Sequence, residues 1–349
     1  MNSYLANFLL FFFALGSLWA KKQPNVVIMF MDDMGYADIG PFGAKDYPTP
    51  NLDRMAKEGR KFTDFYVTQA VCSASRAGLL TGCYNVRVGI LGALGPKSTI
   101  GINPEEVTIA EICKQKGYAT ACYGKWHLGH LKKFLPMQHG FDDYFGLPYS
   151  NDMWPYHPGV LHLPMKERLK RWPNLPLIDG NEVINPAVTG KDQEELTTQY
   201  TDRAVSFIEK NKDRPFLCYL PFNAIHGPFQ APQDLYDKYA SEKDHARRLN
   251  LAMIDSLDQN VGKVLTALET LDLAEDTMVV FLSDNGGHEA SRNLPLRGKK
   301  ATYWEGDLRV PFCLKWPARL KPRETYRKPV ISLDLLPTFV RAAGGKIDP

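Results

Sequence analysis

Short apolar runs that alternate with amphipathic stretches set the pattern of this chain. Four runs of strand length are almost continuous in apolar residues, at 25–31, 118–123, 215–222 and 277–282. Such runs are typical of strands that are buried on both faces of a parallel sheet. The sequence therefore predicts a central sheet that helices cover on both sides.

The stretches between these runs carry helix signals. Residues 49–59 have a threonine at the N-cap position, proline next and a closing glycine, and residues 108–111 form a capping box. Apolar residues at three- and four-residue spacing predict further helices over 194–212, 241–271 and 332–343. Strands that are each followed by a helix favour an α/β fold with a large, mostly parallel β-sheet and helices on both faces.

The segment from about residue 152 to 193 shows no regular pattern and is predicted to be a long loop. Loops of this length are usually functional or disordered. Its aromatic residues, among them Trp154, Tyr156 and Trp172, are suited to stacking on sugar rings. Its basic cluster is more simply interpreted as a solvated face and consists of Lys166, Arg168, Lys170 and Arg171.

Composition narrows the class of protein. The chain has 349 residues, of which 44% are hydrophobic and 23% charged, and this excludes a disordered or fibrous protein. The net charge of +3 is small and no basic run stands out, so no nucleic-acid partner is predicted. Any preference for an anion must belong to a local site.

The first 20 residues lack charge and contain the apolar run Leu9–Leu15, followed by small residues and Ala20. We interpret them as a signal peptide cleaved after Ala20, which leaves residues 21–349 as one domain of an exported protein. A membrane anchor is the alternative, but the run is short for a span of about 20 residues. No stable membrane insertion is expected.

Polar residues follow directly after the predicted strands. Asp32 and Asp33 end the first, Asp284 and Asn285 end the last, and His226 follows the third. The carboxyl ends of parallel strands lie at one edge of a sheet, where α/β folds bind ligands. Two adjacent carboxylates repel each other unless a cation joins them, so a hard metal ion bound through oxygen is predicted. A solvated acidic turn is the alternative.

Lys125 and His127 follow the second strand in the stretch Gly-Lys-Trp-His-Leu-Gly. The glycines on either side suggest a turn that directs both polar side chains to one side. A lysine and a histidine beside a tryptophan are also common as ordinary surface and core residues, so this stretch alone leaves both interpretations open.

The stretch Cys-Ser-Ala-Ser-Arg-Ala-Gly-Leu-Leu-Thr-Gly at 72–82 combines a cysteine, an arginine four residues later and a helix-forming run. The helix predicted here places Cys72 at its N-terminus, where unpaired amides favour an anion. Arg76 is one turn further and can bind two oxygens of a tetrahedral oxyanion. A buried cysteine beside a surface arginine is the alternative.

This stretch resembles the signature of the sulfatase family, and six separate segments match family motifs in the same order. The resemblance implies a core fold similar to that of alkaline phosphatases and the activity of a sulfuric ester hydrolase. It also implies that a formylglycine-generating or other maturing enzyme oxidises Cys72 to formylglycine (3-oxoalanine). The hydrate of that aldehyde would attack the sulfur of a sulfated glycan or an aryl sulfate.

The resemblance also implies roles for individual residues. Calcium would be held by Asp32, Asp33, Asp284, Asn285 and the hydroxyl derived from Cys72. The implied catalytic groups are Cys72, Arg76, Lys125, His127, His226 and Lys300. Ser150 would bind the substrate together with Lys125, His226 and Lys300. Within this scheme His226 and Lys300 protonate the leaving alcohol, and His127 takes the proton when sulfate is expelled.

The chain departs from the family pattern at several places. Ala74 stands where proline is most common, and Ala301 and Asp307 stand where glycine is usual. Counting back from Glu305, Lys300 rather than Lys299 matches the sulfate-binding lysine. The family usually continues with a smaller C-terminal sheet subdomain, so we expect this sequence to lack most of that part.

The six cysteines do not suggest a disulfide framework. If Cys72 is modified, five remain, and an odd number leaves at least one free thiol. Cys122, Cys218 and Cys313 lie in apolar runs and are interpreted as small buried hydrophobic residues.

Two alternatives to a sulfatase stay open. One is a phosphate or phosphonate ester hydrolase of the same superfamily, which would more commonly use serine or threonine as nucleophile. The other is a catalytically silent protein that binds sulfated glycans.

Overall fold

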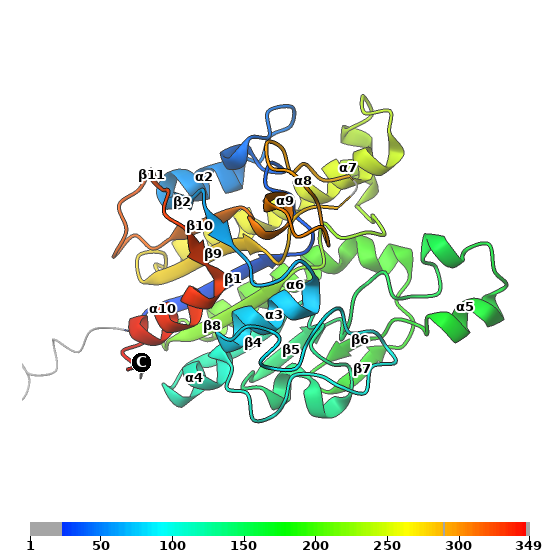
Figure 1. Ribbon diagram of the computed structural model, residues 1–349. Coiled ribbons are helices and arrows are strands. Elements are labelled where there is room, and N and C mark those ends of the chain that lie inside the picture. The colour runs from blue at the N-terminus through cyan, green and yellow to red at the C-terminus, as the bar shows by residue number, and fades with distance from the viewer. Residues whose placement is uncertain (1–22, 289, 347–349) are drawn as a thin grey trace, which may run out of the picture.

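A central sheet of ten strands organises the molecule in the computed structural model, which describes residues 23–346 apart from residue 289 (Figure 1). The strands are β1 Asn25–Met31, β2 Arg60–Phe62, β3 Phe65–Tyr66, β4 Ala119–Tyr123, β5 Asp143–Gly146, β6 Leu177–Asp179, β7 Glu182–Asn185, β8 Phe216–Pro221, β9 Thr277–Ser283, β10 Phe312–Lys315, β11 Glu324–Tyr326 and β12 Val330–Ile331. Their order in the large sheet is β11-β2-β10-β9-β1-β8-β4-β5-β6-β7, and β12 pairs with β3. The five central strands from β9 to β5 are parallel, whereas β10, β6 and β7 pair antiparallel with their neighbours.

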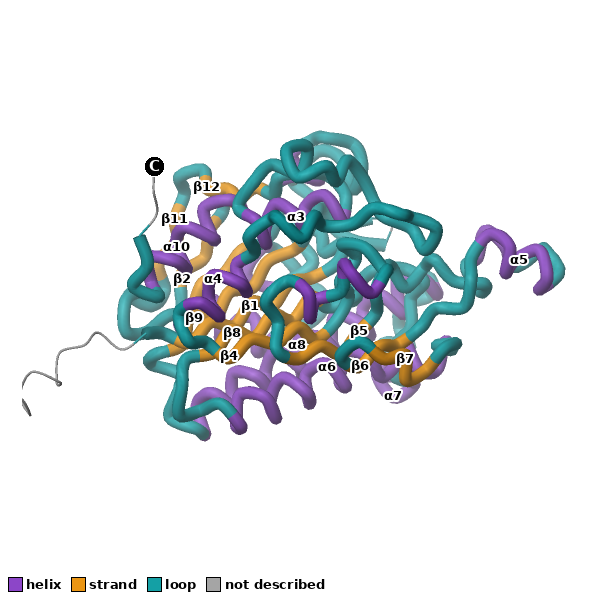
Figure 2. The backbone as a smooth tube through the Cα atoms, turned by 90° about the horizontal axis from the view of Figure 1, so that it is seen from below, coloured by secondary structure: helices purple, strands orange, loops and turns teal. Residues whose placement is uncertain are grey.

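Helices cover both faces of this sheet. They are α2 Pro50–Glu58, α3 Cys72–Thr81, α4 Ile109–Gln115, α5 Met165–Arg171, α6 Gly190–Lys210, α7 Gln233–Lys238, α8 His245–Thr270, α9 Glu305–Leu308 and α10 Leu335–Ala342. Short 3-10 turns are Gly40–Phe42, Lys132–Phe134, Pro136–Gln138, Pro158–Val160 and Ser332–Asp334. The long helices α6 and α8 cover one face, and α3, α4 and α10 cover the other (Figures 1 and 2).

Strand β1 shows why the sheet needs both layers. All seven of its residues are buried, and successive side chains point to opposite faces of the sheet. Val27 and Met29 lie in the hydrophobic core that includes α6 and α8, whereas Val26 and Ile28 lie in the core that includes α3 and α4. The predicted α/β fold is thereby confirmed.

Most predicted elements are confirmed within a few residues. The four apolar runs are β1, β4, β8 and β9, and the capping box of α4 forms between Thr108 and Glu111. Thr49 is the N-cap residue of α2, but its hydroxyl accepts a hydrogen bond from the amide of Gly40 (2.9 Å) and does not cap the helix. The predicted final helix consists of a 3-10 turn followed by α10.

The prediction of a structureless loop up to residue 193 is wrong. This segment contains α5 and the β6–β7 hairpin, and α6 begins at Gly190. The two strands have three and four residues, which is too short for an alternating pattern to be recognised. The basic cluster lies on α5, which buries none of its residues, so its interpretation as a solvated face is confirmed.

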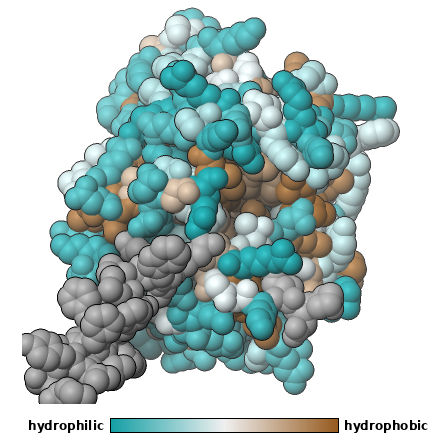
Figure 3. Space-filling view, turned by 90° about the vertical axis from the view of Figure 1, so that its left-hand side faces the viewer, coloured by the Kyte–Doolittle hydropathy of each residue, from teal (hydrophilic) through white to brown (hydrophobic). Residues whose placement is uncertain are grey.

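The two ends of the described chain lie on the same side of the molecule, where the side-chain amide of Gln23 donates to the carbonyl of Ala343 (3.1 Å) (Figure 1). Seen from that side, hydrophobic residues gather between hydrophilic margins (Figure 3). The predicted signal peptide lies outside the described residues. Within residues 23–346, no helix is both long and apolar enough to cross a membrane.

Candidate active site

Two neighbouring strands bring three carboxylates together. Strands β1 and β9 are in register so that Met31 pairs with Ser283, and each strand is followed directly by acidic residues. The amide of Asp33 donates to Oδ1 of Asp284 (3.2 Å). All three carboxylates are buried, with exposed fractions of 0% for Asp32, 3% for Asp33 and 0% for Asp284.

The pKa values of these carboxylates depend on the cations around them. Burial alone would raise the pKa of Asp32, but Lys125 and the other nearby cations outweigh burial and lower it well below its ordinary value. Burial, reinforced by the charge of Asp32, raises the pKa of Asp284 to about 7. Further positive charge beside Asp284 would therefore favour its ionised form.

Cys72 is the first residue of α3, as the sequence predicted. Its Sγ lies 3.5 Å from Oδ1 of Asp32 and 3.4 Å from Nζ of Lys300. Burial raises the pKa of the thiol to about 12. An unmodified Cys72 therefore stays protonated at neutral pH and is a poor nucleophile, because the thiolate is the reactive form of cysteine.

Arg76 lies one turn further along α3 and is completely buried. Its Nη2 lies 2.8 Å from Oδ2 of Asp284 and 3.5 Å from Oδ2 of Asp32, and its Nη1 donates to the carbonyl of Lys125 (2.9 Å). The guanidinium therefore holds the carboxylates and a neighbouring loop together. The predicted contact of Arg76 with a substrate oxyanion stays a prediction.

Lys125 follows β4 through a turn that requires glycine. Gly124 has φ +141°, and a Cβ at this position would lie 2.0 Å from the carbonyl oxygen of Pro221. The ammonium of Lys125 bonds the carboxylate of Asp32 and donates to Oγ of Ser150 (3.0 Å). Ser150, at 1% exposed, is therefore tied to the carboxylate cluster through Lys125.

His127 lies in the same turn. Its Nε2 lies 2.9 Å from the carbonyl oxygen of Leu94, and its Nδ1 is buried without a hydrogen-bond partner among the described residues. Burial, reinforced by the charge of Lys125, lowers the pKa of His127 well below its ordinary value. The neutral tautomer with the proton on Nε2 satisfies the Leu94 carbonyl and leaves Nδ1 able to accept a proton.

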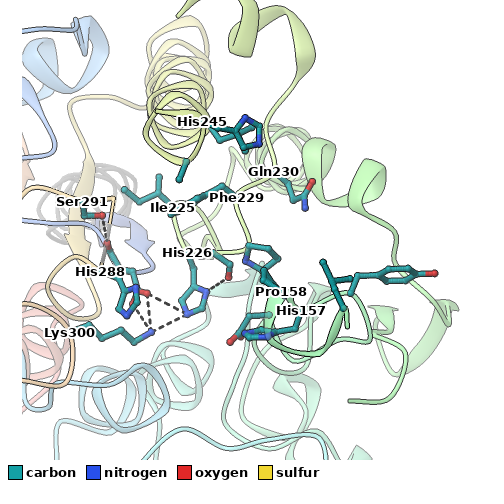
Figure 4. Close-up of a pocket in the computed structure, with 18 residues that line it drawn as sticks. His157, Pro158, Ile225, His226, Phe229, Gln230, His245, His288, Ser291 and Lys300 are labelled. Atoms are coloured by element: carbon teal, nitrogen blue, oxygen red, sulfur yellow. Dashed lines mark hydrogen bonds and ion pairs between the residues drawn. The ribbon is translucent and has the colours of Figure 1, made fainter. Parts of the chain in front are cut away.

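His226 and Lys300 form a contact pair at the mouth of the cluster (Figure 4). Nζ of Lys300 lies 3.0 Å from Nε2 of His226 and 2.8 Å from Oδ1 of Asp33. Nδ1 of His226 contacts the carbonyl oxygen of Gly227, so this nitrogen carries the proton and Nε2 can accept a hydrogen bond from the lysine. A proton can therefore pass between these two side chains.

The loop after Lys300 explains two of the departures from the family pattern. Ala301 has φ 64°, a left-handed conformation that glycine would adopt without strain. Oδ2 of Asp307, which also replaces a glycine, accepts hydrogen bonds from the amides of Thr302 (2.9 Å) and Tyr303 (3.0 Å). The side chain of Asp307 thus fixes the loop that carries Lys300, a role that the sequence analysis missed.

The carboxylate cluster fits a hard metal ion. Oδ1 of Asn285 is buried with no hydrogen-bond partner among the described residues, and Nδ2 of Asn285 donates to Oδ1 of Asp33 (2.8 Å). Single ligand atoms of Asp32, Asp33, Cys72 and His226 all lie within 4.8 Å of one another. This group consists of two carboxylates, a thiol and an imidazole, and does not include Asp284. The carboxylate oxygens of Asp32 and Asp33 and the amide oxygen of Asn285 are of the donor type that calcium prefers.

A cavity of about 620 Å³ opens beside Asp33, His226 and Lys300. Tyr156 and His157, which belong to the aromatic segment singled out from the sequence, lie in its wall. Sequence reasoning missed the other lining residues, which include Asp152, Phe229, Gln230, His245 and His288. His288 could have been noticed because it directly follows the Gly-Gly pair after β9, whereas His245 at the start of α8 carries no local signal.

The fold and these side chains define the class of protein: an α/β protein with a buried carboxylate and cation cluster suited to esters of a tetrahedral oxyanion. A family model described as Sulfatase matches residues 24–345. Rattus norvegicus arylsulfatase G is 34% identical over 97% of this chain and 68% of its own length. Homo sapiens arylsulfatase A is 34% identical over 95% of this chain and 66% of its own length.

The solved structures agree with this family. The crystal structure of Ps i-CgsB in complex with k-i-k-neocarrahexaose has a TM-score of 0.83 and 32% identity, and the match covers 94% of this chain and 73% of that protein. The chain belongs to the sulfatase family of sulfuric ester hydrolases, which confirms the resemblance seen in the sequence. It spans about two thirds of the length of the two arylsulfatases.

Proposed function

We propose that this chain hydrolyses sulfate monoesters with a formylglycine derived from Cys72 and a bound calcium ion. The observation that carries the proposal is the position of Cys72, at the start of a helix and between Asp32 and Lys300 (3.5 and 3.4 Å from its sulfur). A nucleophile at this point has carboxylate oxygens for a metal on one side and cations for the ester on the other.

Asp32, Asp33, Asp284 and Asn285 would hold the calcium. Oδ1 of Asn285, which has no hydrogen-bond partner in the described part of the chain, and the raised pKa of Asp284, about 7, both support a cation at this point. When bound, calcium supplies positive charge that polarises the nucleophile and a sulfate oxygen.

The positive side chains would bind the sulfate group. Lys125 and Lys300 would supply charge that stabilises the negative charge developing on the sulfate oxygens. Oγ of Ser150 accepts a hydrogen bond from Lys125, and its own hydrogen would be donated to a sulfate oxygen. Arg76 keeps the carboxylates in place. Formylglycine supplies a hydrated aldehyde, with one hydroxyl to attack sulfur and a second that allows sulfate to leave.

Two histidines would move the protons. His226 lies beside the open cavity and would protonate the leaving alcohol together with Lys300, by taking a proton from the Lys300 ammonium on Nε2 and passing it on. His127 lies deeper, with Nδ1 able to accept a proton when sulfate is expelled.

A sulfated glycan is the proposed substrate class. The related protein Ps i-CgsB has been crystallised with a neocarrahexaose, and the cavity here has aromatic residues in its wall. We further propose that a maturing enzyme converts Cys72 and that residues 1–20 export the chain.

The test is mass spectrometry of the Cys72 peptide together with release of inorganic sulfate. Protein made in its native host should carry the aldehyde, and it should release sulfate from 4-nitrophenyl sulfate faster than phosphate from 4-nitrophenyl phosphate. A preference for the phosphate ester would support a phosphatase. Binding of a sulfated glycan without any release of sulfate, by protein that carries the thiol, would support a silent binding protein.

A further inference from the structure

A second hollow adjoins the cavity that opens beside the candidate active site. It measures about 670 Å³ and shares His288 and Ser291 with the first cavity, so the two are neighbours on the surface. Figure 4 shows Lys300, His288 and Ser291 together on one side of the first cavity, opposite His157 and Pro158. A substrate longer than one sugar can therefore extend past His288 and Ser291 without leaving the surface of the protein.

The second hollow is cationic. Arg297 and Lys299 line it, both side chains are exposed, and none of its described lining residues carries a carboxylate. Cζ of Arg297 lies over the ring of Trp304, 3.7 Å from the ring centre. The ammonium of Lys299 makes no ion pair with any described residue. The cation–π contact positions the guanidinium while its N–H groups stay available to an anion.

These two charges differ from the cations of the active site. Arg76, Lys125 and Lys300 each contact a buried carboxylate, so carboxylates of the protein itself compensate their positive charge. Arg297 and Lys299 have no such partner among the residues that the structure describes. Their charge is therefore available for a ligand.

We propose that this second hollow, lined by Arg297 and Lys299, is a subsite for a further sulfate group on the sugar next to the one that is desulfated. The proposal rests on the proposed sulfatase function and makes its substrate class narrower: a glycan with sulfate groups on adjacent sugars. The sugar that loses its sulfate lies in the first cavity against Tyr156 and Phe229. The adjacent sugar passes His288 and Ser291, and its sulfate binds the guanidinium and ammonium groups.

The experiment compares two oligosaccharides that carry the same reactive sulfate, one with and one without a second sulfate on the adjacent sugar. The wild-type chain should have a higher kcat/KM for the doubly sulfated one, and the preference should weaken as salt is added. The double variant Arg297→Gln/Lys299→Gln should lose about tenfold in kcat/KM on this substrate, mainly through KM, since two exposed ion pairs are removed. Its activity on the singly sulfated oligosaccharide and on 4-nitrophenyl sulfate should stay unchanged.

Lys116→Gln is the matched control. Lys116 is an exposed lysine just after α4, before β4 begins, and it lines neither cavity. This variant should leave the turnover of all three substrates unchanged. Equal effects of the double variant on both oligosaccharides, or no effect on either, would overturn the subsite.

A binding measurement separates this proposal from the proposed function. Isothermal titration of the doubly sulfated oligosaccharide into the Cys72→Ala chain needs no turnover, and the Arg297→Gln/Lys299→Gln substitutions should weaken that binding about tenfold. If the wild-type chain hydrolyses no sulfate ester but this difference in affinity is found, the catalytic proposal fails and the subsite stands. If sulfate esters are hydrolysed and the affinities are equal, only the subsite fails.

Discussion

Cys72 illustrates how its surroundings limit what one side chain can do. Burial raises the pKa of the thiol to about 12, so almost none of it is ionised at neutral pH. The proposed oxidation to an aldehyde removes this limit, because the hydrate provides oxygen nucleophiles. A serine at the same place would supply one hydroxyl, whereas the hydrate supplies two.

This difference predicts the behaviour of Cys72→Ser. Its single hydroxyl can attack sulfur and release the alcohol, but no second hydroxyl is left to expel the sulfate. The variant should release at most one equivalent of 4-nitrophenol per active site and then stop, with the protein heavier by one sulfo group in intact-mass analysis. Repeated turnover would show that water hydrolyses the ester directly, as in a phosphatase-like mechanism.

Asp307 gives a second prediction for a single residue. Burial raises the pKa of this carboxyl to about 6, compared with about 4 in an unfolded chain. The folded protein therefore holds the proton more tightly, so the contribution to stability is full below pH about 4 and is lost as the pH rises through about 6. Oδ1, which has no hydrogen-bond partner among the described residues, is the oxygen that can carry this proton.

Asp307→Asn removes the titration and keeps an oxygen for the amides of Thr302 and Tyr303. The free energy of unfolding of the wild type, measured in urea relative to this variant, should fall by about 1–2 kcal/mol between pH 4 and pH 7. Asp234→Asn, at an exposed position on α7, serves as the control. Parallel pH profiles for the wild type and Asp307→Asn would contradict the assignment.

The sequence could predict which residue types lie at the strand ends, but not all of their partners. Asp32 and Asp284 were placed at one edge because parallel strands end together. The link from Asp307 to the amides after Lys300 depends on a left-handed residue at Ala301, which no local pattern reveals. Roles carried by tertiary contacts of this kind require coordinates.

At the scale of elements, α8 packs with α6 on one face of the central sheet. Leu257 is completely buried in the core that α8 shares with α6 and β1. The three- and four-residue spacing of its apolar residues predicted this helix, although the structure begins it at His245 rather than residue 241. The elements that were not predicted include α5, β6 and β7, which are short or exposed, so hydrophobic spacing could not mark them.

Leu257→Ala should lower the free energy of unfolding by about 2–5 kcal/mol, because it removes buried methyl groups and leaves a cavity. Thr266→Ala, on an exposed position of the same helix, should change it by less than about 0.5 kcal/mol. Chemical denaturation with both variants tests the comparison. A similar small effect of both substitutions would mean that α8 does not pack on the core as described.

At the scale of the whole molecule, folding itself assembles the charge cluster. Asp32 and Asp284 are separated by most of the chain and meet only when β1 pairs with β9. A cation that needs both carboxylates binds the folded chain and not the unfolded one, so it must stabilise the fold by mass action. The raised pKa of Asp284, about 7, indicates that without such a cation the third negative charge is unfavourable.

Calcium should therefore raise the thermal stability of the chain even when no substrate is present. At a free calcium concentration one hundred times its Kd, the gain in the free energy of unfolding is about 2.7 kcal/mol, which corresponds to several degrees in Tm for a domain of this size.

Magnesium should raise Tm less, because it demands a tighter octahedral shell than this oxygen-rich cluster offers. Asp284→Asn removes one of the proposed ligands and also the charge that pairs with buried Arg76, so the variant should be less stable than the wild type without calcium and should lose most of the increase in Tm that calcium causes. Differential scanning calorimetry of both proteins after chelation, with each metal added back, makes the comparison. An equal increase for the wild type and Asp284→Asn would show that calcium binds elsewhere, and no increase for either would remove the basis for a calcium site in this cluster.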